Sequence, residues 1–318
     1  NEAGEITHQW TEITSRATTS LLPPERGASG CRLVMEDPDA KDVNSECVFF
    51  DDSLNVVDTK HSIYNQAIGI YRPHYEYFAV HPETDKVYLI SDVSFPAFNG
   101  NPEIKADVYM GQFNPDFTQT KCVLGPYTPT EYDQMALCEA IDFHEENIFM
   151  CGYMNTMFGG NAPDTDNFYV AMLDGNLNIV GEIYYHNEKR MVVPYSILVL
   201  ESGDCMVSTA GKDRKSGEMQ HAIFKLSHAI FDGIEEAHDA GFALAIAYPN
   251  PGKDILNIRT ALQNAHVEIY DMSGKQIYNQ EITSNITIIN TSYWSHGTYM
   301  WKVIANGKVA ESGKWIKE

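Results

Sequence analysis

The chain has 318 residues, of which 43% are hydrophobic and 11% aromatic, and it carries a formal net charge of -22. This composition is typical of a folded globular protein, and the length is sufficient for two domains with a large core. The charge is unevenly distributed: residues 246–318 contain 7 basic and 6 acidic side chains, whereas the first 245 residues contain 15 and 38. Because such an acidic surface repels phosphate backbones and anionic lipids, it disfavours nucleic-acid binding and membrane-surface binding.

The chain starts with Asn1 and not with Met, and no signal peptide opens it. We interpret Asn1 as a mature or trimmed terminus, as in an exported protein whose leader has been removed. The longest apolar run, residues 242–248, is much shorter than the ~20 residues of a membrane-spanning helix. We therefore expect no membrane-spanning segment.

The first 231 residues contain a degenerate repeat with a period of about 52–63 residues. One feature is a hairpin that recurs at residues 78–90, 140–150 and 197–208. The other is a strand that ends in a turn and a second apolar pair, at residues 48–54, 109–117, 170–177 and 223–230. Such units are typical of propeller blades, because a four-stranded blade buries both faces only against its neighbours. We predict an all-β, propeller-like domain of about four or more blades over residues 1–231, as a small propeller, a propeller completed by the irregular N-terminus, or an open β array.

The repeat region ends in a short polar segment. Residues 232–241 are small, acidic or otherwise polar, and they predict at most one helical turn. We place a linker at residues 232–244 and a C-terminal domain at residues 245–318.

The C-terminal domain alternates short apolar runs with turn residues, which predicts a small β-domain. Its strongest hairpin signal is Asn306-Gly307, because a type I′ turn needs positive φ at both central residues. A second turn, residues 271–274, joins two further short runs. About seven short strands in a segment of this size indicate an immunoglobulin-like β-sandwich.

Four separated motifs occur in this domain in a fixed order. They are Tyr-Pro-Asn-Pro at 248–251, residues 267–275, residues 297–303 and the basic end at 314–317. Their order and spacing resemble the type A C-terminal sorting domain of cargo proteins of the type IX (Por) secretion system. The residues that carry the motif are Tyr248, Pro249, Asn250, Pro251, Gly274, Gly297, Tyr299 and Lys302.

The resemblance implies a cargo protein of a Gram-negative bacterium. Such a cargo reaches the periplasm, crosses the outer membrane and is released or attached to the cell surface, usually after cleavage near the sorting domain. The repeats over residues 47–231 also resemble the degenerate propeller repeats common in such cargo. The alternative is an ordinary immunoglobulin-like accessory module, such as a carbohydrate-binding or spacer domain.

All six cysteines lie in the front domain, and none forms a Cys-x-x-Cys pair or stands near histidines at zinc-ligand spacing. An even number permits up to three disulfides. Most of them lie in apolar strand-like runs, where a free thiol packs as a small hydrophobic group. We expect buried thiols, and the favoured disulfide, if one forms, is Cys31 with Cys47, because both flank a polar loop.

Candidate catalytic and metal-binding residues are few. Carboxylates and His144 crowd residues 139–146, where a carboxylate pair is compatible with glycoside hydrolysis, but a solvated hairpin tip is the favoured interpretation. Residues 37–42 and 164–167 offer oxygen ligands for calcium without the Gly and distal Glu of a calcium loop. We predict no catalytic residue and no cofactor, with structural calcium left open.

Aromatic residues in loops are the better functional lead. Tyr71, Tyr75, Tyr127 and Tyr132 lie near loops that gather at one end of a propeller, and exposed rings near carboxylates often hold sugars. The alternative is that these rings pack between blades.

The sequence therefore predicts a secreted or cell-surface binding protein, without catalytic activity, whose ligand is a glycan or a protein. The alternative is a secreted hydrolase of the glycosidase type with acidic residues in a propeller cleft, and a third possibility is a structural adhesin or matrix subunit. The expected partners are the type IX secretion machinery and the unknown ligand, and no nucleic acid.

Overall fold

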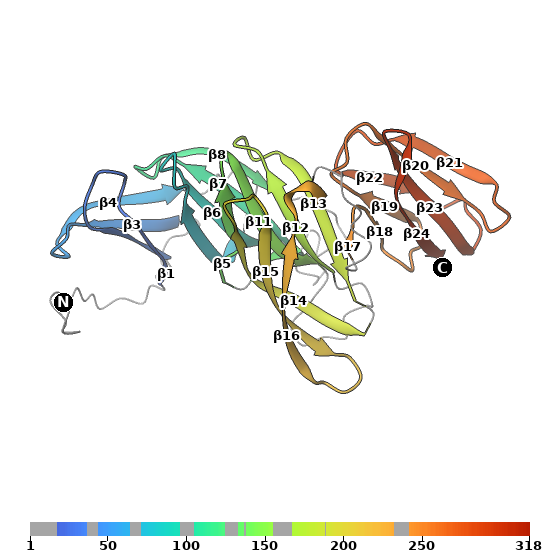
Figure 1. The fold of residues 1–318 in the computed structure, drawn as a ribbon, viewed down its shortest axis with the longest axis horizontal. Coiled ribbons are helices and arrows are strands. Elements are labelled where there is room, and N and C mark those ends of the chain that lie inside the picture. The colour runs from blue at the N-terminus through green and yellow to red at the C-terminus, as the bar shows by residue number, and fades with distance from the viewer. Residues whose placement is uncertain are drawn as a thin grey trace. The chain divides into compact units, whose positions relative to one another are not determined.

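The computed structural model describes residues 18–36, 44–63, 71–95, 105–124, 133–136, 138–154, 167–187, 189–231 and 242–318. In these ranges the named elements are β-strands, apart from one short 3-10 helix, η3 (His228–Ile230) (Figure 1). The prediction of an all-β chain is confirmed. None of the described residues belongs to a helix that is long and apolar enough to span a membrane.

The chain divides into two compact units, residues 1–125 and 126–318. The first unit contains two antiparallel sheets whose strands pair in chain order. One sheet consists of β1 (Thr18–Leu22), β2 (Cys31–Glu36), β3 (Asn44–Phe50) and β4 (Val56–Ile63). The other consists of β5 (Tyr71–Val80), β6 (Val87–Phe95), β7 (Lys105–Phe113) and β8 (Gln119–Leu124).

One core joins these two sheets. Val34 and Cys47 from the first sheet pack in the same cluster as Phe78 and Phe113 from the second. The buried guanidinium of Arg32 supports this contact, because its Nε donates to the Pro23 carbonyl at 2.8 Å and its Nη1 to the Pro115 carbonyl at 3.2 Å.

The second unit begins with two more sheets. In the third sheet the order is β10 (Ile141–His144), β11 (Asn147–Met154), β12 (Asn167–Leu173), β13 (Ile179–His186) and β17 (Phe242–Ala243), and β9 (Asp133–Met135) pairs with β11. The fourth sheet consists of β14 (Arg190–Val199), β15 (Cys205–Asp213) and β16 (Met219–Leu226). Four successive antiparallel sheets match the four predicted repeat units, and the three predicted hairpins are β5–β6, β10–β11 and β14–β15.

The same turn follows the third strand in each of the first three sheets. In the third sheet, Leu177 N–H donates to the Asp174 carbonyl at 2.9 Å, and Asp174 N–H donates to the Asn178 carbonyl at 2.9 Å. Leu54, Phe117 and Leu177 occupy equivalent positions with φ of 60°, 65° and 60°. A positive φ strains a residue with a branched or bulky side chain. Phe117 and Leu177 are nevertheless only 3% exposed, so burial of the side chain offsets the strain.

The C-terminal domain is a β-sandwich, as predicted. One sheet has the order β18 (Ile246–Tyr248), β19 (Ile255–Arg259), β22 (Ile286–Asn290). The other has the order β21 (Gln276–Glu281), β20 (Ala265–Tyr270), β23 (Gly297–Ala305), β24 (Lys308–Lys317). Leu256 and Ile289 from the first sheet and Trp301 and Trp315 from the second fill one core. The predicted Asn306-Gly307 turn joins β23 to β24, with φ of 51° and 75°.

The boundary predicted at residues 232–244 stays a prediction, because residues 232–241 lie outside the described part of the chain. Residues 242 and 243, which the sequence placed in this linker, form β17 and pair with β13.

The predicted Cys31–Cys47 disulfide is wrong, because all six thiols are free. The reason is the strand register: Cys31 lies opposite Phe50, and Cys47 lies opposite Val34, so the two sulfur atoms are not on facing positions. The expectation of buried thiols is confirmed for Cys47, Cys151 and Cys205, whereas Cys138 is exposed. Burial raises the pKa of Cys47 and of Cys205 to about 12.

This arrangement predicts the order of thiol alkylation. Because the thiolate is the nucleophile and burial disfavours it, iodoacetamide should modify Cys138 in the folded protein well before Cys47, Cys151 or Cys205. Peptide mass mapping after alkylation of the unreduced protein, native and in denaturant, measures this. Unfolded but unreduced protein that alkylates at fewer than six cysteines would show a disulfide and contradict the structure.

Candidate functional site

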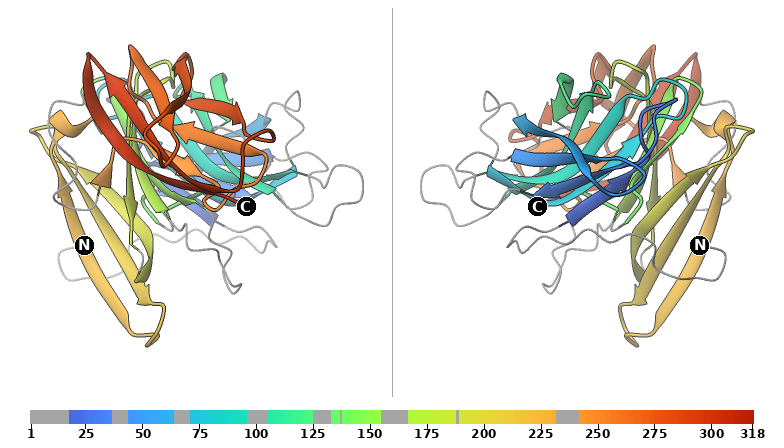
Figure 2. Two further views of the ribbon diagram at one scale, coloured as in Figure 1. Left: turned by 90° about the vertical axis from the view of Figure 1, so that its right-hand side faces the viewer. Right: turned by 90° about the vertical axis from the view of Figure 1, so that its left-hand side faces the viewer.

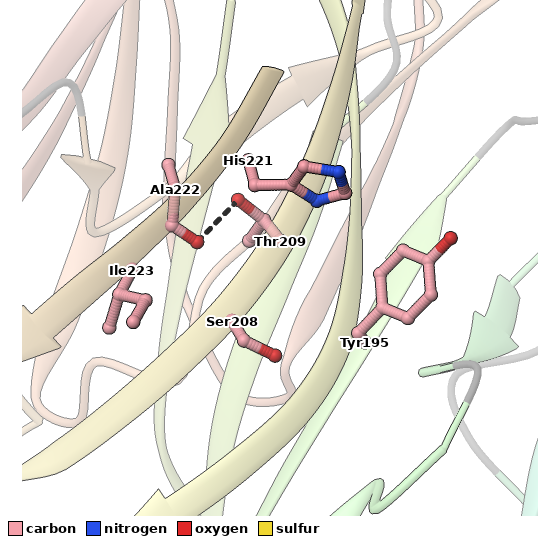
Figure 3. A pocket seen from close by; sticks show the side chains of 6 residues that line it. All are labelled: Tyr195, Ser208, Thr209, His221, Ala222 and Ile223. Carbon is pink, nitrogen blue, oxygen red and sulfur yellow. Dashed lines mark hydrogen bonds between the residues drawn. The ribbon is translucent and has the colours of Figure 1, made fainter. Parts of the chain in front are cut away.

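An open groove of about 520 Å³ lies on the fourth sheet. It is lined by Tyr195 of β14, Ser208 and Thr209 of β15, and His221, Ala222 and Ile223 of β16 (Figure 3). The strand register places Ser208, His221 and Ile223 on one face, because Ser208 lies opposite Ile223 and His221 is two residues from Ile223, whereas Thr209 and Ala222 lie opposite each other on the other face.

Side chains along β15 and β16 alternate between the two faces of the fourth sheet, one of which is buried and the other open. Leu226 and Val207 face the core, and Phe224 packs against rings of the third sheet and β17 at tilted or edge-on angles, with its centroid 4.8 Å from that of Tyr185. On the opposite face Ile223 is 67% exposed and Met219 is 58% exposed. Apolar side chains at this level of exposure, grouped on one sheet face, commonly mark a site of interaction.

The chemistry of the groove is that of recognition. It offers an aromatic ring (Tyr195), an imidazole (His221) and an apolar surface (Ile223). The Ser208 hydroxyl is hydrogen-bonded to the Ser196 hydroxyl at 2.8 Å, and Thr209 Oγ1 donates to the Ala222 carbonyl at 3.3 Å. The described structure gives His221 no hydrogen bond to Ser208 and no ion pair with a carboxylate, so no nucleophile and base are paired here.

Tyr195 projects from an irregularity in β14. The pairing of β14 with β15 shifts between Pro194 and Ser196, so Tyr195 has no direct partner on β15. Its backbone is held from the other side, where Cys138 N–H donates to the Tyr195 carbonyl at 2.9 Å. A bulge of this kind re-aims a side chain, and Tyr195 remains 39% exposed.

The predicted ligand-binding tyrosines lie elsewhere. Tyr71 and Tyr75 belong to β5 in the first unit, and Tyr127 and Tyr132 lie outside the described residues. Sequence reasoning missed the groove, because β14 and β16 read as ordinary hairpin and exit strands. One signal could have singled out the fourth sheet. In the first three repeats a strand-like run follows the turn, whereas the turn of the fourth repeat is followed by residues 232–241, which are mostly small or polar.

One acidic residue of the β10–β11 hairpin, Asp142, accepts hydrogen bonds from backbone amides. Asp142 Oδ2 accepts a hydrogen bond from Val199 N–H at 2.6 Å, and its Oδ1 accepts from Phe143 N–H at 2.8 Å. Glu145 and Glu146 are exposed in the turn, as expected for a solvated hairpin tip. Asp142 therefore ties the third sheet to β14.

The described residues contain no group of three or more His, Cys, Asp or Glu placed to hold a metal ion. The acidic residues proposed for calcium at 37–42 and 164–166 lie outside the described part of the chain. Calcium binding there stays a prediction.

The Tyr-Pro-Asn-Pro motif forms a clasp between the start and the end of the sandwich. Asn250 acts as a peptide mimic: its Nδ2 donates to the Lys314 carbonyl at 2.9 Å, and its Oδ1 accepts from Ile316 N–H at 2.9 Å. The buried Trp315 donates through Nε1 to the Pro249 carbonyl at 2.6 Å. Gly252 is required beside it, since a Cβ there would lie 2.8 Å from the Trp315 ring.

The other motif residues fall into two groups. Tyr299 is buried and donates to the Ser295 carbonyl at 2.7 Å. Pro251, Gly274 and Gly297 are exposed, and Lys302 lies over the Tyr270 ring at 5.3 Å. The motif therefore contains residues that stabilise the fold of the sandwich and residues whose surfaces are accessible to a partner.

A buried ion pair fastens the sandwich to the third sheet. Arg259 of β19 is 1% exposed, and its Nη2 lies 2.5 Å from Oε1 of Glu182 on β13. Tyr184 donates to the same carboxylate at 2.5 Å, and Arg259 also lies over the Tyr184 and Tyr169 rings. Burial and the Glu182 charge raise the pKa of Tyr184, so its hydroxyl stays a donor.

Comparison with known proteins identifies the sandwich. Residues 246–318 match the family model described as a secretion system C-terminal sorting domain. No curated protein matches the chain. The solved structures similar to it include PorZ, a surface component of the type-IX secretion system of Porphyromonas gingivalis, at 11% identity, covering 96% of this chain and 58% of PorZ, with a TM-score of 0.28.

Two enzymes are similar at the same low level. They are an endo-arabinase from Bacteroides thetaiotaomicron (10% identity, 94% of this chain, 97% of that chain, TM-score 0.35) and a mutant Synechocystis apocarotenoid oxygenase (9% identity, 88% and 66%, TM-score 0.37). The family match shows that residues 246–318 are the predicted type IX sorting domain, so this chain is exported to the cell surface or the extracellular space.

The clasp predicts a loss of stability in Asn250→Asp. This change replaces the Nδ2 donor with a second oxygen facing the Lys314 carbonyl, so the sorting domain should lose about 1–3 kcal/mol. Thermal or urea unfolding followed by tryptophan fluorescence measures it, because three of the four tryptophans lie in this domain. Asn279→Asp on the exposed side of β21 is the matched control. Equal stability of the two variants would refute the clasp.

Proposed function

We propose that this exported protein is a non-catalytic binding protein, and that its ligand, a glycan or a protein, binds in the groove across β14, β15 and β16. The observation that carries the proposal is the combination of one exposed ring, hydroxyl and imidazole groups and an exposed aliphatic side chain on a single open face. Pockets of this composition hold ligands by stacking and a few hydrogen bonds.

The tyrosines named from the sequence belong to the same proposal as further ligand contacts. Tyr71 and Tyr75 are carried by β5 of the first unit. Their participation, with that of Tyr127 and Tyr132, is a hypothesis about additional binding surface, separate from the groove.

The alternative is a secreted hydrolase of the glycosidase type. That reaction needs two carboxyl groups on either side of the bond to be broken. In the described residues no carboxylate lines the groove, and Asp142, from the hairpin singled out as a possible carboxylate pair, accepts two backbone hydrogen bonds. These observations favour binding over hydrolysis.

We also propose that the motif residues act in export in two ways. Tyr248, Pro249, Asn250 and Tyr299 maintain the fold of the sorting domain, and Pro251, Gly274, Gly297 and Lys302 form the surface that the machinery contacts. The supporting observation is that the first four positions are buried or hydrogen-bonded, whereas Pro251, Gly274 and Gly297 are exposed and Lys302 is half-buried with its ammonium over the Tyr270 ring.

Removal of residues 246–318 tests the export role. The truncated protein should accumulate in the periplasm of its host, because it lacks the sorting domain. Immunoblotting of periplasm, cell surface and medium measures the distribution. Normal export of the truncated chain would contradict the assignment.

The Tyr195→Ala variant tests the binding role. Loss of the ring should weaken binding about 3- to 10-fold, since an aromatic contact contributes about 0.5–1.5 kcal/mol beyond its buried area. The probes are arrays of purified polysaccharides and outer-membrane proteins, read by biolayer interferometry with the full chain.

Tyr293→Ala, which removes a ring that is 93% exposed in the sorting domain, is the matched control. An unchanged affinity of the Tyr195→Ala variant for its ligand would show that the ligand does not bind in the groove. Turnover of nitrophenyl glycosides or arabinan by the purified chain would show that the protein is a hydrolase and contradict the proposal of a non-catalytic binding protein.

A further inference from the structure

The fourth sheet is one strand short. The first three sheets each continue past the shared turn into a further antiparallel strand, namely β4, β8 and β13. The fourth sheet reaches the corresponding turn, where Ile230 N–H donates to the Ser227 carbonyl at 3.1 Å, and it has no further strand among the described residues. When the chain returns as β17, it pairs with β13 of the third sheet.

The outer edge of β16 therefore offers backbone hydrogen-bonding groups. Asp213 N–H donates to the Glu218 carbonyl, and antiparallel ladders alternate, so even-numbered residues of β16 face β15. The N–H and C=O groups of Met219, His221, Ile223 and Lys225 point away from it. Eight residues of edge span about 26 Å, enough for a peptide of similar length. Figure 2 shows the fourth sheet extending past the other strands of its unit, and β14 pairs with β15 as far as Asp213, so β16 carries the free edge of this end of the sheet among the described residues.

The other edge of the same sheet is covered. Ile197 N–H of β14 donates to the Glu139 carbonyl at 2.9 Å, and Val199 N–H donates to Asp142. The contrast between the two edges matters, because an unpaired strand edge is a template for pairing with another chain.

The charge beside the β16 edge is opposite to that of the protein. In a chain of net charge -22, residues 212–226 contain four basic and two acidic side chains, and one of the four, Lys225, is paired with Asp204 at 3.0 Å. Lys212, Arg214 and Lys215 are exposed. The Asp213 carboxylate is engaged by Lys215 N–H, Ser216 N–H and the Ser216 hydroxyl, which leaves Glu218 as the remaining acid. This edge attracts an acidic partner and disfavours a second copy of itself.

We propose that the outer edge of β16 binds an extended acidic peptide segment of another protein, which adds to the fourth sheet as its missing strand. The inference rests on the proposed binding function and names its partner class. Backbone pairing along β16 supplies affinity, and the alternate side chains of the peptide contact Ile223 and Met219 on the open face. Lys212, Arg214 and Lys215, which are exposed, select acidic sequences.

The test measures binding of an octapeptide of alternating Glu and Val to the full chain by fluorescence anisotropy. A peptide of the same composition with alternating D- and L-residues places all its side chains on one side when extended, so it cannot match the side-chain alternation of a strand in this sheet. Polygalacturonate represents an anionic polysaccharide. We expect binding of the all-L peptide at least 10-fold tighter than that of the mixed peptide. Equal binding of both peptides, binding of the polysaccharide alone, or no binding would overturn strand addition.

Two variants locate the site. Ile223→Pro removes an outward N–H that β15 does not use, and Lys212→Glu with Lys215→Glu reverses the charge. Each should weaken peptide binding at least 10-fold, while Lys308→Glu with Lys314→Glu on the sorting domain leaves it unchanged. Should Ile223→Pro fail to fold by circular dichroism, the charge reversal decides alone, and undiminished binding in it contradicts the proposal.

The two proposals fail in different ways. If the protein does not bind the acidic peptide but binds another ligand, and Tyr195→Ala weakens that binding, only strand addition is disproved. A protein that hydrolyses glycosides disproves the binding function itself.

Discussion

The pairing of backbone groups at strand edges is the constraint on which this structure depends. A chain made almost entirely of short antiparallel sheets has many edges, and an unpaired edge invites another strand. The protein covers several of them with its own chain. β17 lies along β13, residues 138–142 engage β14, and the amide of Asn250 pairs with the backbone of β24 in place of a strand. β16, like the equally long edge strand β4, has no such cover from the described residues, and the fourth sheet alone lacks a strand after the shared turn among them.

The same constraint explains why the sorting domain is not a loose tail. β17 joins the third sheet immediately before the sandwich begins, and the Glu311 carboxylate accepts a hydrogen bond from Leu244 N–H at 3.0 Å. The Arg259–Glu182 pair is desolvated, so it is stable only while both partners are present; removal of one partner of such a pair costs about 3–5 kcal/mol. The sorting domain and the third and fourth sheets therefore belong to one compact unit.

Local patterns were predictable from the sequence. The hairpins at 78–90, 140–150 and 197–208, the Asn306-Gly307 turn and the sandwich follow from alternation and turn chemistry, which act over a few residues. The recurring apolar residue after each turn was visible as a repeat, but its positive φ was not, because Leu54 and Phe117 are residue types that avoid that conformation.

Strand register and contacts between residues far apart in the sequence were not predictable. The Cys31–Cys47 disulfide failed because the register of β2 on β3 is fixed by many pairs at once, and loop composition does not reveal it. The role of Arg259 depends on Glu182, 77 positions earlier, and nothing local marks either residue. Tyr195 becomes a groove residue through a bulge in β14, so a search for aromatic residues in loops passes over it.

Residue-resolved amide hydrogen exchange on the free, full-length protein tests the open edge most directly. We expect the amides of His221, Ile223 and Lys225 to exchange orders of magnitude faster than those of Ala222 and Phe224 in the same strand, because only the latter pair with β15. Amides of β13 should be protected along the part that β17 covers. Uniform protection along β16 would show that another part of the chain already occupies the edge, and it would contradict the account.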